Sequence, residues 1–109
     1  MSKPENWTKD QFYTFALIHA ANADLEICDT ESDYLRNKYG TENFEAMERS
    51  YFDMGEYERI ESILACKDRY FKSQRDKDKL IDEMETMFRI DGNYSKLEKN
   101  LKLFFEKLL

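Results

Sequence analysis

Two copies of one acidic pattern contain residue types that can bind a metal ion. Asp24 is followed seven residues later by Glu31, and Asp91 is followed at the same distance by Glu98. Each copy follows an apolar run expected to be helical and precedes the start of another expected helix. Carboxylate oxygens are the ligands that Ca²⁺ and Mg²⁺ prefer. If the two junctions lie side by side, the spacing predicts one divalent-cation site with four ligands: Asp24, Glu31, Asp91 and Glu98.

The pattern matches the second half of an EF-hand loop, with departures. The first loop position would fall on Ala20 or Met87, and neither residue is a carboxylate. Leu25 replaces the turn glycine in the first copy, whereas the second copy retains Gly92. An ordinary EF-hand is therefore not expected. Four carboxylates brought together would repel and raise one another's pKa values, and a divalent cation would remove that repulsion.

Helix capping is the alternative interpretation of the same acids. Ser95-x-x-Glu98 fits a capping box, and Cys28-x-x-Glu31 is a degenerate form of it. The two aspartates would then accept hydrogen bonds from turn amides. Each cap would stabilise its helix by about 1 kcal/mol without any metal ion. The residues alone leave both interpretations open.

A central helix is expected to position the first copy. Thr8 and Gln11 form a capping box, and Trp7 with Phe12 can form a hydrophobic staple. From Phe12 to Ala23 the residues are apolar nearly all round. A helix without a polar face is buried against neighbours on several sides, so this helix should be central.

Helical periodicity continues through the rest of the chain. A helix is expected from about Asp29 to Tyr39, ending at Gly40, and the next begins at Thr41 and is broken by Met54-Gly55. Another is expected from about Glu56 to Phe71. The helix after it follows a Ser73 cap and ends at Asp91-Gly92, and Ser95 caps the last helix. The apolar residues expected at core positions of the middle three are Phe44, Met47, Tyr51 and Phe52, then Tyr57, Ile60, Ile63, Leu64 and Tyr70, then Leu80, Ile81, Met84, Met87 and Phe88. Short connections favour an all-α fold, a compact antiparallel bundle of about six short helices in a single domain over residues 1–109.

Composition and charge restrict the function classes. The 109 residues are 41% hydrophobic and 15% aromatic, with three glycines and one proline, which excludes an all-β fold. The net charge of −6 argues against nucleic acid or an anionic membrane as the main partner.

No run is long and apolar enough for an integral membrane segment or a signal peptide. Cys28 and Cys66 form no paired motif, so reduced thiols and a cytoplasmic location are expected. The mixed-charge stretch 67–79 predicts a solvated helix–helix corner, with nucleic-acid stacking by Tyr70 and Phe71 as the alternative.

The chain resembles the tellurite-resistance TerB-like family over roughly residues 8–108. That family has an apolar helix followed by A-D-G-x-[I/V]-x-x-x-E, and later a second D-G-x-x-x-x-x-E. The matching residues here are Ala23, Asp24, Ile27, Glu31, Asp91, Gly92 and Glu98. The resemblance implies two related helical halves whose shared acids form a divalent-cation site. It also implies a role in tellurite or chemical-stress responses, as a module beside a protein partner in a larger assembly.

Two functions from different classes follow. The first is a non-catalytic helical module that binds Ca²⁺ or Mg²⁺. The second is a metal-independent interaction or scaffold domain, which an exposed aromatic patch at Tyr34, Tyr39 or Tyr51 would support. An enzyme is not expected, because only the clustered carboxylates suggest phosphohydrolase-like chemistry. His19 is interpreted as a core residue, with metal ligation as its alternative. The oligomeric state stays open.

Overall fold

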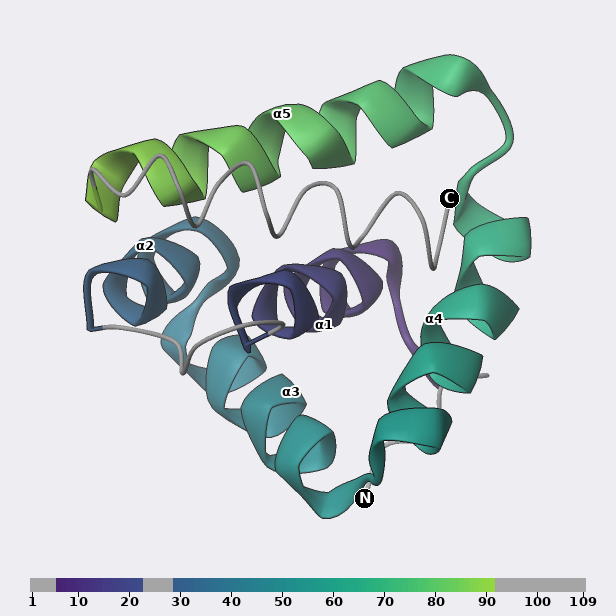
Figure 1. Ribbon diagram of the computed structural model, residues 1–109, viewed down its shortest axis with the longest axis horizontal. Helices are drawn as coiled ribbons and strands as arrows, with labels where there is room; N and C mark the ends of the chain where they lie inside the picture. Colours follow the sequence, from purple (N-terminus) through teal and green to yellow (C-terminus); the bar gives the residue numbers. More distant parts are fainter. Residues whose placement is uncertain (1–5, 23–28, 92–109) are drawn as a thin grey trace.

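The computed structural model describes residues 6–22 and 29–91, which contain five α-helices (Figure 1). The helices are α1 (Lys9–Asn22), α2 (Asp29–Tyr39), α3 (Thr41–Asp53), α4 (Glu56–Tyr70) and α5 (Gln74–Asp91). No strand occurs within these two ranges, so the all-helical prediction is confirmed for them. None of these five helices has the length and apolarity needed to cross a membrane. The sixth helix expected after Ser95 lies outside the described residues, and the pseudo-repeat stays a prediction.

The predicted capping box begins α1. The backbone N–H of Thr8 donates to Oε1 of Gln11 at 2.8 Å, and the N–H of Gln11 donates to Oγ1 of Thr8 at 3.1 Å. Trp7 is buried with its ring centroid 4.6 Å from that of Phe15. The carbonyl oxygen of Trp7 accepts a hydrogen bond from the hydroxyl of Tyr70. The start of α1 is thereby tied to the end of α4.

Helix α1 is the central element, as its lack of a polar face predicts. It contacts each of the other four described helices, and Figure 1 shows it enclosed by them. Thr14 is a buried polar residue on this helix. Its hydroxyl donates to the carbonyl of Asp10 at 2.7 Å and accepts from Nδ2 of Asn43 at 3.0 Å. These bonds offset the cost of burying a hydroxyl in the core.

A single glycine separates α2 from α3. Gly40 has φ +92°, a left-handed conformation that costs glycine little and other residues more. Its N–H donates to the carbonyl of Arg36 and its own carbonyl accepts from the N–H of Phe44, both at 2.9 Å. The same residue therefore ends one helix and begins the next. The predicted stop at Gly40 and start at Thr41 are confirmed.

The start of α5 is capped by an acid three residues beyond the predicted cap. Oδ2 of Asp76 accepts from the backbone N–H of Lys72 at 3.2 Å and from the hydroxyl of Ser73 at 3.5 Å. Ser73 therefore acts as a donor at this helix start, and the carboxylate supplies the acceptor. Acidic residues in the first turn also interact favourably with the helix dipole.

Seven of the predicted core positions are buried, namely Phe44, Met47, Tyr51, Ile63, Leu80, Met84 and Met87. Ile60, Leu64, Tyr70 and Ile81 are partly buried, and the side chain of Phe88 lies outside those that the structure describes. Two of the predicted positions are wrong. Phe52 and Tyr57 are 58% and 73% exposed. One residue advances a helix by about 100°, so Phe52 points well away from the direction of Tyr51. By the same geometry Tyr57 lies roughly 120° around α4 from Ile63.

The aromatic residues at the end of α4 pack against α1. The ring of Phe12 stacks on Tyr70 at 5.7 Å between centroids and meets the edge of Phe71 at 5.3 Å. Both rings are half-buried. Tyr70 and Phe71 therefore pack the α4–α5 connection against α1. This packing is compatible with the prediction that residues 67–79 form a helix–helix corner.

Candidate functional site

The structure describes the side chain of one of the four predicted ligands. Glu31 lies in the first turn of α2 and is fully buried, at 0% exposed. Asp91 is the last residue of α5, while Asp24 and Glu98 lie outside the described residues. An ionised carboxylate removed from water costs several kcal/mol unless hydrogen bonds or a cation compensate. A cap and a metal ligand would both supply such compensation.

Helices α2 and α5, which carry Glu31 and Asp91, are neighbours. They pack against each other, with α2 beside the C-terminal half of α5 in Figure 1. Within residues 6–22 and 29–91, no group of three or more His, Cys, Asp or Glu side chains is arranged to hold a metal ion. A four-carboxylate site therefore depends on Asp24 and Glu98, and the predicted convergence stays a prediction.

The histidine and one of the two cysteines lie in core contacts. His19 is partly buried, with its ring centroid 5.9 Å from that of Tyr51 on α3. Cys66 is buried, and this burial raises the pKa of its thiol. A higher pKa leaves less thiolate at neutral pH, so Cys66 is poorly suited to nucleophilic chemistry. Cys28 lies outside the described residues.

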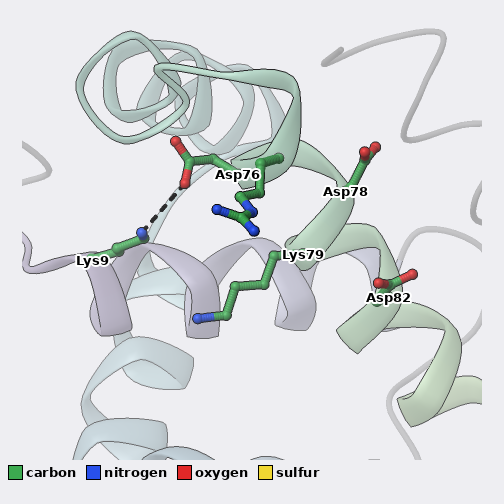
Figure 2. Close-up of a pocket in the computed structure, with 6 residues that line it drawn as sticks. Lys9, Asp76, Asp78, Lys79 and Asp82 are labelled. Atoms are coloured by element: carbon green, nitrogen blue, oxygen red, sulfur yellow. Dashed lines mark ion pairs between the residues drawn. The ribbon is translucent and has the colours of Figure 1, made fainter.

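A polar hollow lies where the start of α1, the end of α2 and the first half of α5 meet. Figure 2 shows the larger of its two parts, which residues of α1 and α5 line. The two adjoining parts, of about 610 and 240 Å³, share Lys9 and Lys79. Figure 2 shows the ammonium groups of these two lysines on one side and the carboxylates of Asp78 and Asp82 on the other. The remaining lining residues are Asp10, Tyr13, Lys38, Tyr39, Arg75, Asp76 and Glu83.

Glu83 connects α5 to the last turn of α2 in this hollow. It is only 9% exposed, and both of its carboxylate oxygens have partners. Oε2 accepts a hydrogen bond from the hydroxyl of Tyr39, and Oε1 lies 3.4 Å from Nζ of Lys38. Burial, followed by this hydrogen bond, raises the pKa of Tyr39. The phenol therefore remains a hydrogen-bond donor to Glu83 at neutral pH.

Asp76 forms a second connection, between α5 and α1. Nζ of Lys9 lies 3.6 Å from Oδ1 of Asp76, and the Tyr13 hydroxyl donates to the Asp76 carbonyl at 3.4 Å. Desolvation acts to raise the pKa of Asp76, but the backbone N–H of Lys72 and the Lys9 ammonium outweigh it and lower that pKa. Burial, with Asp76 and Glu83 nearby, raises the pKa of Tyr13 to about 12. The central charges of the hollow are thus paired across helices, an arrangement that positions α1, α2 and α5.

This hollow was not predicted from the sequence, although the sequence contains one sign of it. Leu80, Met84 and Met87 are buried along one face of α5. Glu83 falls three residues after Leu80 and four before Met87, which places a carboxylate on that same apolar face. A charged residue at a core position requires a partner from another helix. The partners of Glu83 are Lys38 and Tyr39 on α2, which only the tertiary structure identifies.

Phe52 near the end of α3 and Tyr57 near the start of α4 are exposed aromatic side chains on either side of one turn, and we call this region the aromatic corner. Figure 1 shows the connection between these two helices. Tyr51 next to Phe52 is buried, with its ring 5.3 Å from that of Phe52 in an edge-on arrangement. The guanidinium of Arg59 lies 3.9 Å over the Tyr51 ring and 6.0 Å over the Phe52 ring.

The expected aromatic patch is therefore in a different place. Tyr51 is buried, and Tyr34 and Tyr39 are half-buried, so these three do not form an exposed patch. The rings that do reach solvent are Phe52 and Tyr57, which the periodicity assigned to the core. An amphipathic pattern alone does not distinguish a ring that the fold buries from a ring that it leaves exposed.

Comparisons with protein-family models, with curated proteins and with solved structures found no match. The resemblance to the TerB-like family accordingly stays a prediction based on the residues that carry it.

Proposed function

We propose that this chain is a non-catalytic helical interaction module that binds a protein partner at the aromatic corner. The observation that carries the proposal is the exposure of Phe52 and Tyr57, at 58% and 73%. The other aromatic side chains that the structure describes are buried or half-buried. Aromatic residues are enriched among the few residues that supply most of the energy in protein interfaces. Two such rings on either side of one turn suit that role.

The backbone that carries these rings is held in place. The carbonyl oxygen of Tyr51 accepts hydrogen bonds from the N–H of Met54 at 3.3 Å and from Nε of Arg59 at 2.8 Å. Met54 is buried, and its sulfur accepts a hydrogen bond from the hydroxyl of Ser62 at 3.6 Å. A surface fixed before binding loses less conformational entropy when the partner docks. The corner is therefore a rigid platform for two exposed rings.

This proposal agrees with the capping interpretation of the acids. As caps, Glu31 and Glu98 stabilise helix starts, and the module needs no metal ion to fold. The resemblance to the TerB-like family supports a module in a larger, stress-related assembly.

The proposal is tested by trapping the partner in the source cells through a photo-crosslinking residue at position 57. The trapped protein is then purified and its affinity measured by calorimetry with the wild-type chain and with Phe52→Ser/Tyr57→Ser. We expect the double substitution to weaken binding on the order of tenfold or more, as loss of a central aromatic contact does. Ile90→Ser is the matched control, because Ile90 is 50% exposed at the far end of α5. Equal affinity for the wild-type chain and the Phe52/Tyr57 variant would refute this docking surface.

Divalent-cation binding by Asp24, Glu31, Asp91 and Glu98 is a second candidate function. The observation that favours it is the complete burial of Glu31 at the predicted position. A hard cation such as Ca²⁺ or Mg²⁺ would compensate a carboxylate buried in this way.

Thermal unfolding tests the cation candidate, first in EDTA and then with millimolar Ca²⁺ or Mg²⁺. An ion at 100 times its Kd adds about 2.7 kcal/mol, which raises the midpoint on the order of 10 °C for a domain of this size. The rise should vanish in Asp24→Asn/Asp91→Asn and persist in Asp33→Asn, whose side chain is exposed on α2. Identical midpoints with and without the ions would leave the acids as helix caps.

A further inference from the structure

We propose that the partner segment bound at the aromatic corner is rich in arginine, and that its guanidinium groups stack on Phe52 and Tyr57 beside carboxylates. This inference rests on the proposed function, since it names the chemistry of the partner for the same surface. Three observations support it: the charge around the corner, an arginine already held by its rings, and a carboxylate next to Tyr57.

The chain around the corner is strongly acidic. Between residues 45 and 61 there are six acids and two arginines. Most of these acids are exposed, namely Glu45, Asp53, Glu56, Glu58 and Glu61. A surface of one sign attracts a segment of the opposite sign and suppresses partners of like charge. An aromatic surface surrounded by carboxylates therefore favours a basic partner over a neutral or acidic one.

Arg59 shows how this corner holds a guanidinium group. Its Nε donates to the carbonyl of Tyr51 at 2.8 Å while the planar group lies 3.9 Å over the Tyr51 ring. This is a cation–π contact with a hydrogen bond in addition. Arg59 is farther from Phe52, at 6.0 Å, and Phe52 remains 58% exposed. The Phe52 ring thus retains free surface for a second guanidinium from a partner.

Tyr57 combines a ring with an adjacent carboxylate. Its hydroxyl is hydrogen-bonded to Glu61, and this bond raises the pKa of Tyr57. The ring itself is 73% exposed. A guanidinium stacked on such a ring can also donate to the carboxylate beside it, because the group carries five N–H donors in a plane. Lysine lacks this planar geometry, so arginine is the better match.

The test uses three synthetic peptides of equal length with blocked ends: (Arg-Leu-Gly)₃, the same peptide with citrulline in place of arginine, and (Glu-Leu-Gly)₃. Citrulline keeps the shape of arginine and removes its charge. Each peptide is titrated into the ¹⁵N-labelled full chain, and amide shifts of residues 50–61 are followed by NMR. We expect saturable shifts at the corner with the arginine peptide, and affinity at least tenfold lower with the other two.

Variants locate the binding and separate its parts. Phe52→Ser/Tyr57→Ser and Glu56→Lys/Glu61→Lys should each abolish the shifts at the corner, while Ile90→Ser and Asp33→Lys should leave the affinity unchanged. Weaker binding at higher salt should accompany a charge-assisted contact.

The failures of the two proposals are distinguishable. Corner shifts that depend on Phe52 and Tyr57 but are equal for the arginine and citrulline peptides would overturn the basic partner and leave the docking surface intact. Shifts by the arginine peptide that are confined to other acidic parts of the chain, or no shifts at all, would also overturn the inference. The docking surface itself fails if the trapped partner binds the Phe52→Ser/Tyr57→Ser variant as tightly as the wild-type chain.

Discussion

The polar hollow and the aromatic corner both contain aromatic rings and carboxylates, but these groups are paired between helices in the hollow and exposed to solvent at the corner. In the hollow, the carboxylate of Glu83 and the phenol of Tyr39 are turned toward each other and joined across two helices. At the corner, Phe52 and Tyr57 extend into solvent, with 58% and 73% of their surface exposed. The hollow is therefore explained by its contribution to the fold. The exposed rings of the corner contribute little to the fold, which makes them candidates for binding.

The largest contrast in stability should occur between two adjacent residues of the corner. Tyr51→Ala should destabilise the chain by about 3 kcal/mol, because it removes a buried ring from a well-packed site. That ring lies 5.6 Å from Phe15 and 3.9 Å from the Arg59 guanidinium. Phe52→Ala should change the free energy of unfolding by no more than about 0.5 kcal/mol. Urea denaturation of both variants measures this difference directly.

A similar cost for the two substitutions would contradict the contrast. It would mean that Phe52 is packed in solution, and the exposed ring could then not serve as a docking residue. Phe52→Tyr is a useful control, since it keeps the ring and adds a hydroxyl that solvent can reach.

The second largest effect is expected in the hollow. Glu83→Ala removes the acceptor for the Tyr39 hydroxyl and the ion partner of Lys38, and both groups would remain near the interface of α2 and α5. We expect a loss of about 2 kcal/mol, typical of leaving a largely buried polar group without its partner. Glu85→Ala is the matched control, because Glu85 forms an exposed i,i+4 pair with Arg89 at 3.5 Å. That pair should contribute less than about 0.5 kcal/mol.

Equal effects of the two substitutions in urea denaturation would show that Glu83 does not connect the helices. Glu83→Gln refines the comparison, since an amide still accepts from Tyr39 but has no charge for Lys38. Its cost should lie between those of the alanine variant and the wild-type chain.

How far the sequence predicts this fold depends on whether the determinant is local. The helix boundaries at Thr8, Gly40 and Thr41 follow from caps and a positive φ, which act within a few residues. The exposure of Phe52 and Tyr57 depends on which helices lie beside α3 and α4, and periodicity does not contain that information. Their side chains satisfy a helical spacing and yet remain exposed.

The sites were harder to predict than the helices for the same reason. The hollow joins Lys9, Lys38–Tyr39 and Asp76–Glu83, three segments that are distant in sequence. Only Glu83 gave a local sign, as a charge on an apolar face. The four-carboxylate site was predicted from spacing, and its test still depends on whether Asp24 and Glu98 approach Glu31 and Asp91.

The third largest effect should appear in the hollow at alkaline pH. Burial raises the pKa of Tyr13 from 10.0 to about 12 and also raises that of Tyr39, both in the hollow. A phenol with a higher pKa in the folded state contributes stability that is present below pH 10 and is lost as pH rises from 10 toward 12. We therefore expect the free energy of unfolding to fall over that range. The decline should be smaller in Tyr13→Phe, and absorbance at 295 nm should report late ionisation of this phenol.

Tyr57→Phe is the comparison for this pH effect: the hydrogen bond with Glu61 also raises the pKa of Tyr57, but this side chain is exposed and solvent screens the interaction, so its removal should reduce the alkaline decline less than Tyr13→Phe does. If Tyr13→Phe declines as steeply as the wild-type chain, the loss of stability at high pH arises elsewhere.

The smallest expected effect concerns the lysines at the rim of the hollow. Nζ of Lys9 lies 3.6 Å from Asp76, and both side chains are partly exposed to solvent, at 45% and 25%. Such a pair contributes between about 0.2 and 1 kcal/mol and weakens as salt screens it. Lys9→Met should therefore lower the free energy of unfolding by less than Glu83→Ala does. Urea denaturation at about 0.05 M and at about 0.5 M NaCl measures this, and the loss should be smaller at the higher salt because the Debye length is shorter. A cost as large as that of Glu83→Ala, or one that salt does not change, would show that Lys9 acts through the cation–π contact of its ammonium with the Tyr13 ring, 5.6 Å from the ring centroid, and not through its charge pair. The polar hollow would then be held together at this end by a cation–π contact, as Arg59 and Tyr51 hold the base of the aromatic corner.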